Sequence, residues 1–492
     1  MVFSSAVFLF AFLPIVFGLC LLPIPLRVKN VILILASLFF YAYGEPVYVF
    51  LMLASSIVNY TFGRLLGMSS IKKLNVDLDS LEVRKYVGIK ETKTPYRTLL
   101  LVIAVILNIG TLGVFKYTDF ILDSINEGFG SNIPLPGIKL PIGISFFTFQ
   151  ALSYVIDVYR NPKLEQKSYP AILLYISMFP QLVAGPIVKY SDIEYQIYNR
   201  KQNTDEMFLG IARFTKGLFK KMFIANVVGG IADNIFALNI SEYSFLPAWL
   251  GAVCYALQIY FDFSAYSDMA LGLGHMFGFK FRENFDHPYS AVSINDYWDR
   301  WHISLSSWFK EYVYIPLGGN RKGKFRTELN KLIVFLLTGI WHGANWTFIL
   351  WGMIHGVANV IEDTILPIGK LKGKGRIIGN VYTWIIAVVA FVFFRADSIS
   401  YGLAFVGSMF GHWSLDSASL SVFAEQMNVY NIITLIAALV LSYPVAGKLK
   451  HKLESNTKRM EVVFVAASMV ALLLCILRLS SGSYNPFIYF RF

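Results

Sequence analysis

The stretch Leu332–Ile361, LIVFLLTGIWHGANWTFILWGMIHGVANVI, contains no Asp, Glu, Lys or Arg. Because about 20 apolar residues in a helix cross a bilayer core, this run predicts membrane-embedded structure. Other charge-free runs near or above spanning length are Pro46–Gly63, Thr98–Phe115, Ser168–Val188, Tyr243–Phe261, Ile377–Phe394, Gln426–Gly447 and Val462–Leu477. Shorter or interrupted apolar runs are Met1–Leu26, Val31–Tyr43, Leu140–Val155 and Ile303–Leu317. The pattern predicts an all-α polytopic protein with about ten to twelve membrane-embedded helices, some of them re-entrant.

The composition of the whole chain supports a membrane location. Of 492 residues, 56% are hydrophobic and only 15% are charged, whereas soluble domains carry about 25% charged residues. The net charge of +12 comes largely from Lys and Arg in short connecting segments, as the positive-inside rule expects of cytoplasmic loops. We therefore expect a multi-pass protein of the cell membrane, with no nucleic-acid partner. The segments predicted to face the cytoplasm are Ser69–Arg97, Asn320–Lys331 and Lys370–Arg376.

His342 lies inside the Leu332–Ile361 run, where an ionisable side chain is costly and is therefore a candidate for function. Helical spacing would place Asn345 and Trp346 beside it, at i+3 and i+4. The alternative is a neutral core histidine bonded to a backbone carbonyl. Gly343 and the flanking tryptophans favour a close-approach pocket, which makes His342 the first candidate catalytic residue.

His302 is the second candidate, in a segment rich in tryptophan. Trp298, Asp299 and Ser306 lie at i−4, i−3 and i+4 from it. A continuous helix would place an indole, a carboxylate and a hydroxyl on the face of His302, where they could orient the imidazole. The alternative is an interfacial amphipathic helix whose tryptophans lie at headgroup level.

Other polar features are less specific. Asp262 and Asp268 follow directly on an apolar span, and they would either line a polar cavity or cap helix ends. The chain has no nucleotide-binding, zinc-protease or serine-hydrolase motif. We expect no metal site, because the remaining histidines lack ligand spacing: these are His275, His287, His355 and His412.

The chain ends in the aromatic sequence Asn485-Pro-Phe-Ile-Tyr-Phe-Arg-Phe492. Aromatic residues of this kind commonly anchor a chain at the membrane interface. A phenol on such a tail could also enter a pocket and act as a nucleophile. Tyr489 is therefore a candidate for either role.

Seven motifs along the chain combine aromatic and polar residues. They are Pro141-Ile-Gly-Ile-Ser-Phe-Phe-Thr-Phe-Gln150, Phe179-Pro-Gln-Leu-Val-Ala-Gly-Pro186, Phe261-Asp-Phe-Ser-Ala-Tyr-Ser-Asp268, Trp298-Asp-Arg-Trp-His-Ile-Ser-Leu-Ser-Ser-Trp-Phe309, Tyr314-Ile-Pro-Leu-Gly-Gly-Asn320, Trp341-His-Gly-Ala-Asn-Trp346 and Phe393-Phe-Arg-Ala-Asp397. Together they resemble the membrane-bound O-acyltransferase family, and in particular its bacterial branch that acetylates exopolysaccharides such as alginate, or peptidoglycan. The resemblance covers nearly the whole chain, and its two Trp-His motifs contain His302 and His342.

The resemblance implies one membrane domain over residues 1–492, with about eleven transmembrane helices and re-entrant segments around a central funnel. His342 would lie at the base of this funnel. The expected parts of the domain are N-terminal helices (1–135), a catalytic core (136–365), C-terminal helices (366–480) and an aromatic tail (481–492).

The same resemblance implies reaction partners. An acyl thioester would enter from the cytoplasm, either as acyl-CoA or on an acyl-carrier protein, and we expect acetyl-CoA. An extracytoplasmic protein of the SGNH type would complete transfer to the polymer, membrane lipid would surround the protein, and no cofactor would be bound permanently. The segment Phe487-Ile-Tyr-Phe-Arg-Phe492 resembles an aromatic C-terminal sequence thought to carry the acyl group, which makes Tyr489 the candidate carrier. It departs from that pattern at Arg491, where an uncharged Gln is more usual.

The chemistry requires a base, because a phenol titrates near pH 10 and is a poor nucleophile at neutral pH. Neutral His342 would take the proton as the oxygen attacks the thioester carbonyl. His302 would orient the acceptor or polarise the carbonyl, Asp299 and Ser306 would orient His302, and Asn345 would donate a hydrogen bond to the developing oxyanion. The expected function is transfer of an acetyl group across the membrane for O-acylation of an extracytoplasmic polysaccharide or peptidoglycan.

Two alternatives remain open on the sequence. A D-alanyl transferase that modifies teichoic acid would share the fold and both histidines. A transporter would also carry polar residues at membrane depth, but transporters commonly show paired halves, and no internal repeat is visible in this chain.

Overall fold

The computed structural model describes residues 1–71, 94–239, 244–411, 413, 417–445, 457–482 and 488, and every regular element within these ranges is helical. This confirms the prediction of an all-α fold. The chain divides into two compact units, one formed by Met1–Gly210 and Leu273–Arg282, the other by Ile211–Gly272 and Glu283–Phe492. The expected single domain, with parts that change after residues 135 and 365, stays a prediction.

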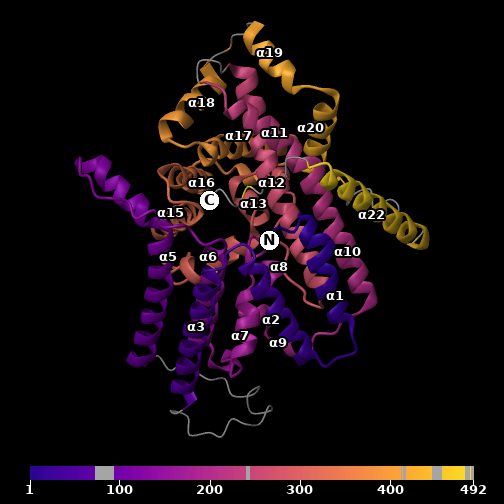
Figure 1. Cartoon of the computed structure of the whole chain (residues 1–492). Coiled ribbons are helices and arrows are strands. Elements are labelled where there is room, and N and C mark those ends of the chain that lie inside the picture. Colours follow the sequence, from indigo (N-terminus) through magenta and orange to yellow (C-terminus); the bar gives the residue numbers. More distant parts are fainter. Residues whose placement is uncertain are drawn as a thin grey trace. The chain divides into compact units, whose positions relative to one another are not determined.

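The first unit contains a group of helices in which α3, α5 and α6 pack on one another (Figure 1). Local sequence sets the ends of α5. Thr94 caps its N-terminus by accepting a hydrogen bond from the Arg97 N–H, Pro95 is its first residue, and Gly130 ends it with a positive φ. The elements of this unit are η1 (Phe8–Phe12), α1 (Leu13–Leu21), α2 (Leu26–Ala42), α3 (Tyr48–Ile71), α5 (Pro95–Phe129), α6 (Ile144–Arg160), η2 (Pro162–Leu164), α7 (Tyr169–Ser177), α8 (Phe179–Leu182) and α9 (Tyr190–Asn199).

The second unit contains both candidate histidines and most of the remaining helices. Helix α10 (Thr204–Phe219) begins in the first unit and continues into the second. The helices that follow are η3 (Lys220–Ala225), α11 (Asn226–Phe236), α12 (Phe245–Met276), η5 (Pro288–Ser290), α13 (Ile294–Arg300), α14 (Ile303–Phe309), η6 (Lys310–Tyr314), α15 (Lys324–His342), α16 (Trp346–Thr364), η7 (Ile368–Lys370), α17 (Gly375–Arg395), α18 (Ile399–Gly411), α19 (Ser417–Gln426), α20 (Val429–Leu441) and α22 (Thr457–Ser480).

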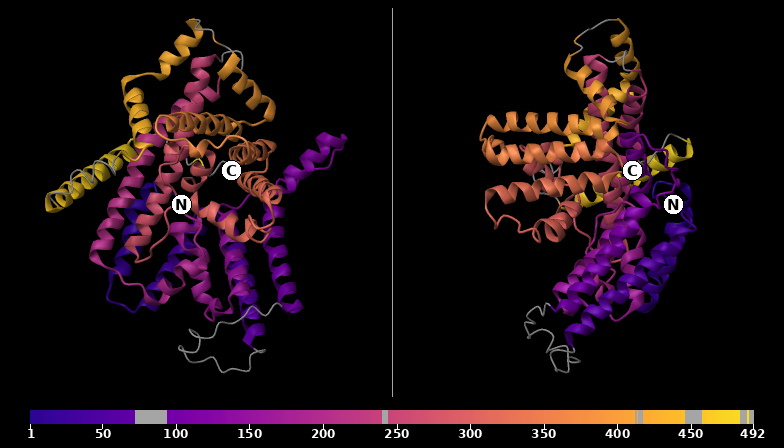
Figure 2. Two further views of the ribbon diagram at one scale, coloured as in Figure 1. Left: turned by 180° about the vertical axis from the view of Figure 1, so that it is seen from behind. Right: turned by 90° about the vertical axis from the view of Figure 1, so that its left-hand side faces the viewer.

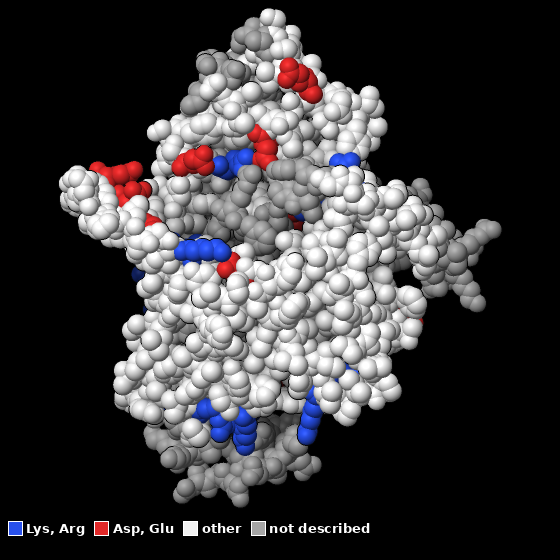
Figure 3. Space-filling view, viewed as in Figure 1, with Lys and Arg blue, Asp and Glu red and all other residues white. Residues whose placement is uncertain are grey.

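Much of the described surface is apolar, as a membrane protein requires. On the face shown in Figure 3, acidic and basic side chains occupy only small areas. Within the described residues, three helical segments are long and apolar enough to cross a membrane: Tyr48–Met68, Pro95–Phe129 and Gly375–Arg395. The bent pair α19 and α20 forms a fourth candidate if it is counted as one broken span. The expected number of about eleven spans stays a prediction.

The run Leu332–Ile361 does not form one continuous span. Helix α15 ends at His342, Gly343 is extended with φ −161°, and α16 begins at Trp346. The prediction that Asn345 and Trp346 share a helical face with His342 is therefore wrong. The physical reason is that Asn345 adopts an extended conformation and its side chain accepts a hydrogen bond from the Thr347 N–H, which starts a new helix.

Helices α15, α16 and α17 pack side by side in chain order (orange in the right-hand view of Figure 2). The contact between α15 and α16 is close enough to require glycine. A Cβ atom on Gly339 would lie 2.5 Å from the carbonyl oxygen of Phe348, and one on Gly352 would collide with the carbonyl oxygen of Phe335. Glycine at both positions lets the two backbones approach directly, and it holds the end of α15, where His342 lies.

We expect Gly339→Ala to lower the thermal stability of the protein in detergent, by about 1–3 kcal/mol in the free energy of unfolding, because the added methyl overpacks the contact. Gly110 of α5 is the matched control, since a Cβ there meets no atom within 4 Å. Gly110→Ala should be neutral or stabilising, because Ala favours helix over Gly by about 1 kcal/mol. Equal melting temperatures for the two variants would contradict the close-packing interpretation.

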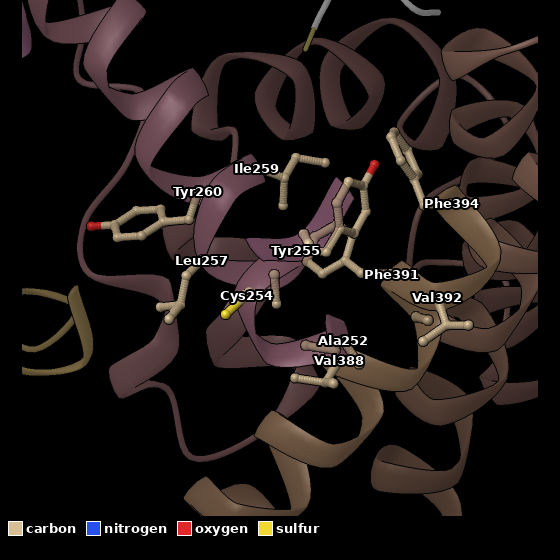
Figure 4. Packing of buried hydrophobic residues seen from close by; sticks show 14 of the residues in the cluster. Ala252, Cys254, Tyr255, Leu257, Ile259, Tyr260, Val388, Phe391, Val392 and Phe394 are labelled. Carbon is tan, nitrogen blue, oxygen red and sulfur yellow. The ribbon is translucent and has the colours of Figure 1, made fainter. Parts of the chain in front are cut away.

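The core of the second unit lies between α12 and α17. Figure 4 shows Tyr255 and Ile259 of α12 beside Phe391 and Phe394 of α17. Residues of α13 and α16 complete the same buried cluster, including Trp298 and Trp351. This apolar layer surrounds the position of His342.

Candidate active site

His342 is buried at the C-terminal end of α15, with 7% of its surface exposed. Its ring contacts Trp341 and Trp351 with centroids 4.9 Å apart in each case, and Phe394 at 5.2 Å. It lines a cavity of about 10 Å³ together with Trp301 and Phe263, which is room for about one water molecule. The predicted close-approach pocket around His342 is present, and it is mainly aromatic.

Asn345 has a different place from the one predicted. Its amide oxygen accepts a hydrogen bond from the Thr347 N–H at 3.0 Å, and its amide nitrogen donates to the backbone carbonyl of Asp397 at 3.1 Å. The amide therefore links the start of α16, through its oxygen, to the chain just after α17, through its nitrogen. These contacts give Asn345 a structural role at a helix N-terminus.

His302 is fully buried between two short helices and has φ +45°. Among the described non-glycine residues, only His287 shares a positive φ, a conformation that costs free energy for a side chain of this size. Nδ1 of His302 lies 3.1 Å from Oδ1 of Asn284. The same oxygen accepts a hydrogen bond from Oγ of Ser304 at 2.8 Å, so Asn284 and Ser304 hold the ring.

The prediction that Asp299 and Ser306 orient His302 across one helical face is wrong. Helix α13 ends at Arg300, and α14 begins after His302. This break rotates the two flanking helices away from a common face. Asp299 is exposed, and the hydroxyl of Ser306 donates to the carbonyl of Trp301 at 3.4 Å.

A buried carboxylate fixes the start of α13. Glu362 of α16 is 4% exposed and accepts hydrogen bonds from the Ile294 N–H at 2.5 Å and the Asn295 N–H at 3.1 Å. An acidic group at a helix N-terminus is electrostatically favourable. Glu362 thereby attaches the segment that leads to His302 to the helix that begins near His342.

The two candidate histidines share aromatic neighbours in the tertiary structure. Trp341 has its ring centroid 6.2 Å from His302 and 4.9 Å from His342. Phe263 contacts the His302 ring at 4.7 Å and also lines the His342 cavity. The histidines are 40 positions apart in the sequence (302 to 342), and they share aromatic neighbours in the structure.

Ile488 of the C-terminal segment also reaches this site. It is 2% exposed, belongs to the buried core and lines the cavity that contains His342. Its backbone N–H donates to Oδ2 of Asp262 at 2.9 Å. Tyr489, the predicted carrier, lies outside the described residues, but its neighbour in the chain is at the histidine.

A larger cavity of about 590 Å³ lies on another side of α12. Three basic residues converge there on Asp268, with N–O distances of 3.0 Å for Arg213, 3.0 Å for Lys220 and 3.6 Å for Lys216. Asn284 and Phe285 line this cavity, and both also contact the His302 ring. The charged cavity and the buried histidine therefore share these two neighbours.

The sequence left open whether Asp262 and Asp268 line a cavity or cap helix ends. Both lie in the interior of α12, so neither is a cap. Asp268 lines the charged cavity, and buried Asp262 accepts a hydrogen bond from the Ile488 N–H. Within the part of the chain that the structure describes, no group of three or more His, Cys, Asp or Glu side chains is arranged to hold a metal ion.

Several residues of the site carry no signal in the sequence. Asn284 lies in an irregular segment between helices, where no periodicity marks a buried residue. Trp351 and Phe394 are aromatic residues in apolar runs, which is typical of any core. Only the motif Phe393-Phe-Arg-Ala-Asp397, which supported the family resemblance, indicated the neighbourhood of Phe394.

The comparisons with known proteins identify the family. A family model described as the membrane-bound O-acyltransferase family matches residues 85–400. The chain is 37% identical to a protein named "probable alginate O-acetylase" from Azotobacter vinelandii, with all of both chains covered. It is 32% identical to a peptidoglycan O-acetyltransferase of Helicobacter pylori, covering 100% of this chain and 98% of the relative.

A teichoic acid D-alanyltransferase of Bacillus subtilis is more distant, at 28% identity over 44% of this chain and 57% of the relative. The resemblance inferred from the motifs is confirmed, and the transporter alternative is wrong. The family model covers both Trp-His motifs, and the acetyltransferase relatives match along the full chain. The chain belongs to the membrane-bound O-acyltransferase family and is a membrane enzyme that transfers acyl groups to oxygen.

Proposed function

We propose that the protein transfers an acetyl group from a thioester donor to a hydroxyl of an extracytoplasmic polysaccharide or peptidoglycan, with His342 as the general base. The observation that carries this proposal is the placement of His342. It is a buried imidazole at the end of α15, it faces a cavity of about 10 Å³, and Ile488 of the C-terminal segment lines that same cavity. Burying an ionisable group at this depth costs free energy, which makes His342 a candidate for function.

In the proposed reaction, His342 removes the proton of an attacking hydroxyl as the oxygen adds to the thioester carbonyl. The tetrahedral intermediate then collapses by breaking the carbon–sulfur bond. The protonated His342 returns its proton to the departing thiolate, so the products are an oxygen ester and a free thiol. The aromatic contacts of His342 leave room for about one water molecule and keep bulk water from the base, which favours transfer over hydrolysis.

His302 acts beside this base, held by Asn284 and Ser304. The hydrogen bond at Nδ1 fixes the ring, so that Nε2 has a defined direction. No described residue provides a hydrogen-bond partner for this Nε2 atom. In the proposed site, Nε2 contacts the acceptor or the thioester carbonyl.

The charged cavity is a suitable binding site for the phosphate groups of the donor. Arg213, Lys216 and Lys220 share one carboxylate, Asp268, and basic side chains of this kind bind phosphate oxygens. Acetyl-CoA carries phosphates next to a flexible thioester arm, so it suits a charged cavity whose lining residues Asn284 and Phe285 also contact His302. We therefore propose acetyl-CoA as the donor.

Acetyl transfer is favoured over D-alanyl transfer by the extent of similarity. The relatives named for acetylation of alginate and of peptidoglycan match over the whole chain, whereas the D-alanyltransferase of Bacillus subtilis matches over 44% of it. We further propose that Tyr489 receives the acetyl group and that an extracytoplasmic protein of the SGNH type moves it to the polymer.

The donor distinguishes the two chemistries. We expect the purified protein to release free thiol from acetyl-CoA at a rate at least about tenfold above that from a D-alanyl carrier protein, equivalent to about 1.4 kcal/mol of transition-state discrimination. The His342→Ala protein provides the blank for thiol release. Faster release from the D-alanyl carrier protein would overturn the acetyl assignment and favour modification of teichoic acid.

A further inference from the structure

Asp262 forms a buried ion pair that connects three distant parts of the second unit. Its Oδ1 lies 2.8 Å from Nζ of Lys221, with side-chain exposures of 0% for Asp262 and 3% for Lys221. Its Oδ2 accepts the backbone N–H of Ile488 at 2.9 Å. Helix α12, the π-helical segment η3 and Ile488 therefore meet at one carboxylate.

Stability alone does not account for this pair. Removing two charges from water is costly, and apolar residues of similar volume are often as stabilising as a buried ion pair. The second oxygen of Asp262 has a specific use, because it binds a main-chain N–H that lies 226 positions away in the sequence. A bond to the main chain holds the position of the chain itself, whichever side chain that residue carries.

The position that is held is at the reaction site. Ile488 lines the His342 cavity, and Ile259 and Phe263, which flank Asp262 on α12, line it as well. The proposed acyl carrier, Tyr489, follows Ile488 directly in the sequence, and consecutive Cα atoms are about 3.8 Å apart. The carboxylate thus acts one residue before the carrier.

We infer that Asp262, paired with Lys221, is a positioning residue that holds the C-terminal segment beside His342 for acyl transfer. The inference rests on the proposed function for the identity of the base and of the carrier. The contact at Ile488 can be measured without any acyl transfer, so the two ideas can fail separately.

The test uses the double variant Lys221→Met/Asp262→Leu in the full-length protein. It removes the acceptor for the Ile488 N–H without leaving a buried charge unpaired, which protects the fold. Hydrogen–deuterium exchange of the C-terminal peptide reports the contact. We expect exchange at Ile488 to be at least about tenfold faster than in the wild type, since a hydrogen bond to a charged group is one of the stronger kinds.

Asp268→Asn is the matched control, because Asp268 is a second buried carboxylate of α12 and pairs with Lys220, the neighbour of Lys221. In this variant the exchange of the C-terminal peptide should equal that of the wild type. In the double variant, kcat for polymer acylation should fall at least about tenfold, with the KM for the donor unchanged, because the lost contact positions the acceptor and not the charged cavity proposed for the donor.

Two results would overturn the inference. Unchanged exchange at Ile488 in a folded double variant would mean that Asp262 does not hold the segment. Faster exchange together with wild-type kcat would mean that the hydrogen bond between Asp262 and Ile488 does not contribute to acyl transfer. An active His342→Ala protein would instead contradict the proposed base and would leave the exchange result intact.

Discussion

Replacing His342 with Ala should yield a folded, membrane-inserted protein whose rate of acyl transfer is about 10²–10⁴-fold below that of the wild type, the usual cost of losing a general base. The imidazole accepts a proton only as the hydroxyl attacks, so the loss falls on kcat while the KM for the donor changes little. Single-turnover thiol release from acetyl-CoA, measured per folded molecule, provides the test.

Two further variants separate base loss from packing loss. His355→Ala removes an imidazole that is fully buried against Trp351, the residue that also contacts His342, but His355 does not line the His342 cavity. Its turnover per folded molecule should remain near that of the wild type. His342→Gln keeps much of the side-chain volume without a comparable base, so it should be as inactive as His342→Ala. Recovery of turnover in the Gln variant would assign His342 to packing.

Replacing Tyr489 with Phe should lower polymer acylation in cells at least about a hundredfold, because the ring remains while the nucleophilic hydroxyl is lost. A phenyl ester retains much of the transfer potential of a thioester, since phenolate is a better leaving group than an alkoxide. The acyl group could therefore pass from the tail to the polymer without further energy input. Mass spectrometry of the wild-type C-terminal peptide should show an acetyl group on Tyr489.

Tyr484→Phe is the matched control, because it makes the same chemical change five positions earlier in the chain (489 to 484). It should leave polymer acylation intact. If cells with Tyr489→Phe acylate the polymer normally, the tail is an anchor, and the acceptor hydroxyl belongs to another molecule. Esterification of Tyr489 that disappears in His342→Ala would connect the carrier to the base.

The burial of His302 and His342 could be predicted from the sequence, but the neighbours expected for them differ from those in the structure. Both were identified as ionisable groups in or beside apolar runs, which is a property of composition along the chain. The neighbours assigned to them assumed unbroken helices. His302 instead occupies a positive-φ turn between α13 and α14, and the chain turns after His342, so the contacts come from Asn284 and Trp351.

The sequence by itself determined the fold class, the membrane character and the family of this protein. Long charge-free runs indicate a membrane protein rather than a soluble one. The Trp-His motifs are short sequences that can be recognised without knowing which residues they contact. Only the tertiary structure decided which residues surround the histidines. Asp262 and Ile488, for example, are 226 positions apart, and hydrophobic periodicity describes near neighbours alone. Pairing over that distance depends on how α12, η3 and the C-terminal segment pack, which no local pattern encodes.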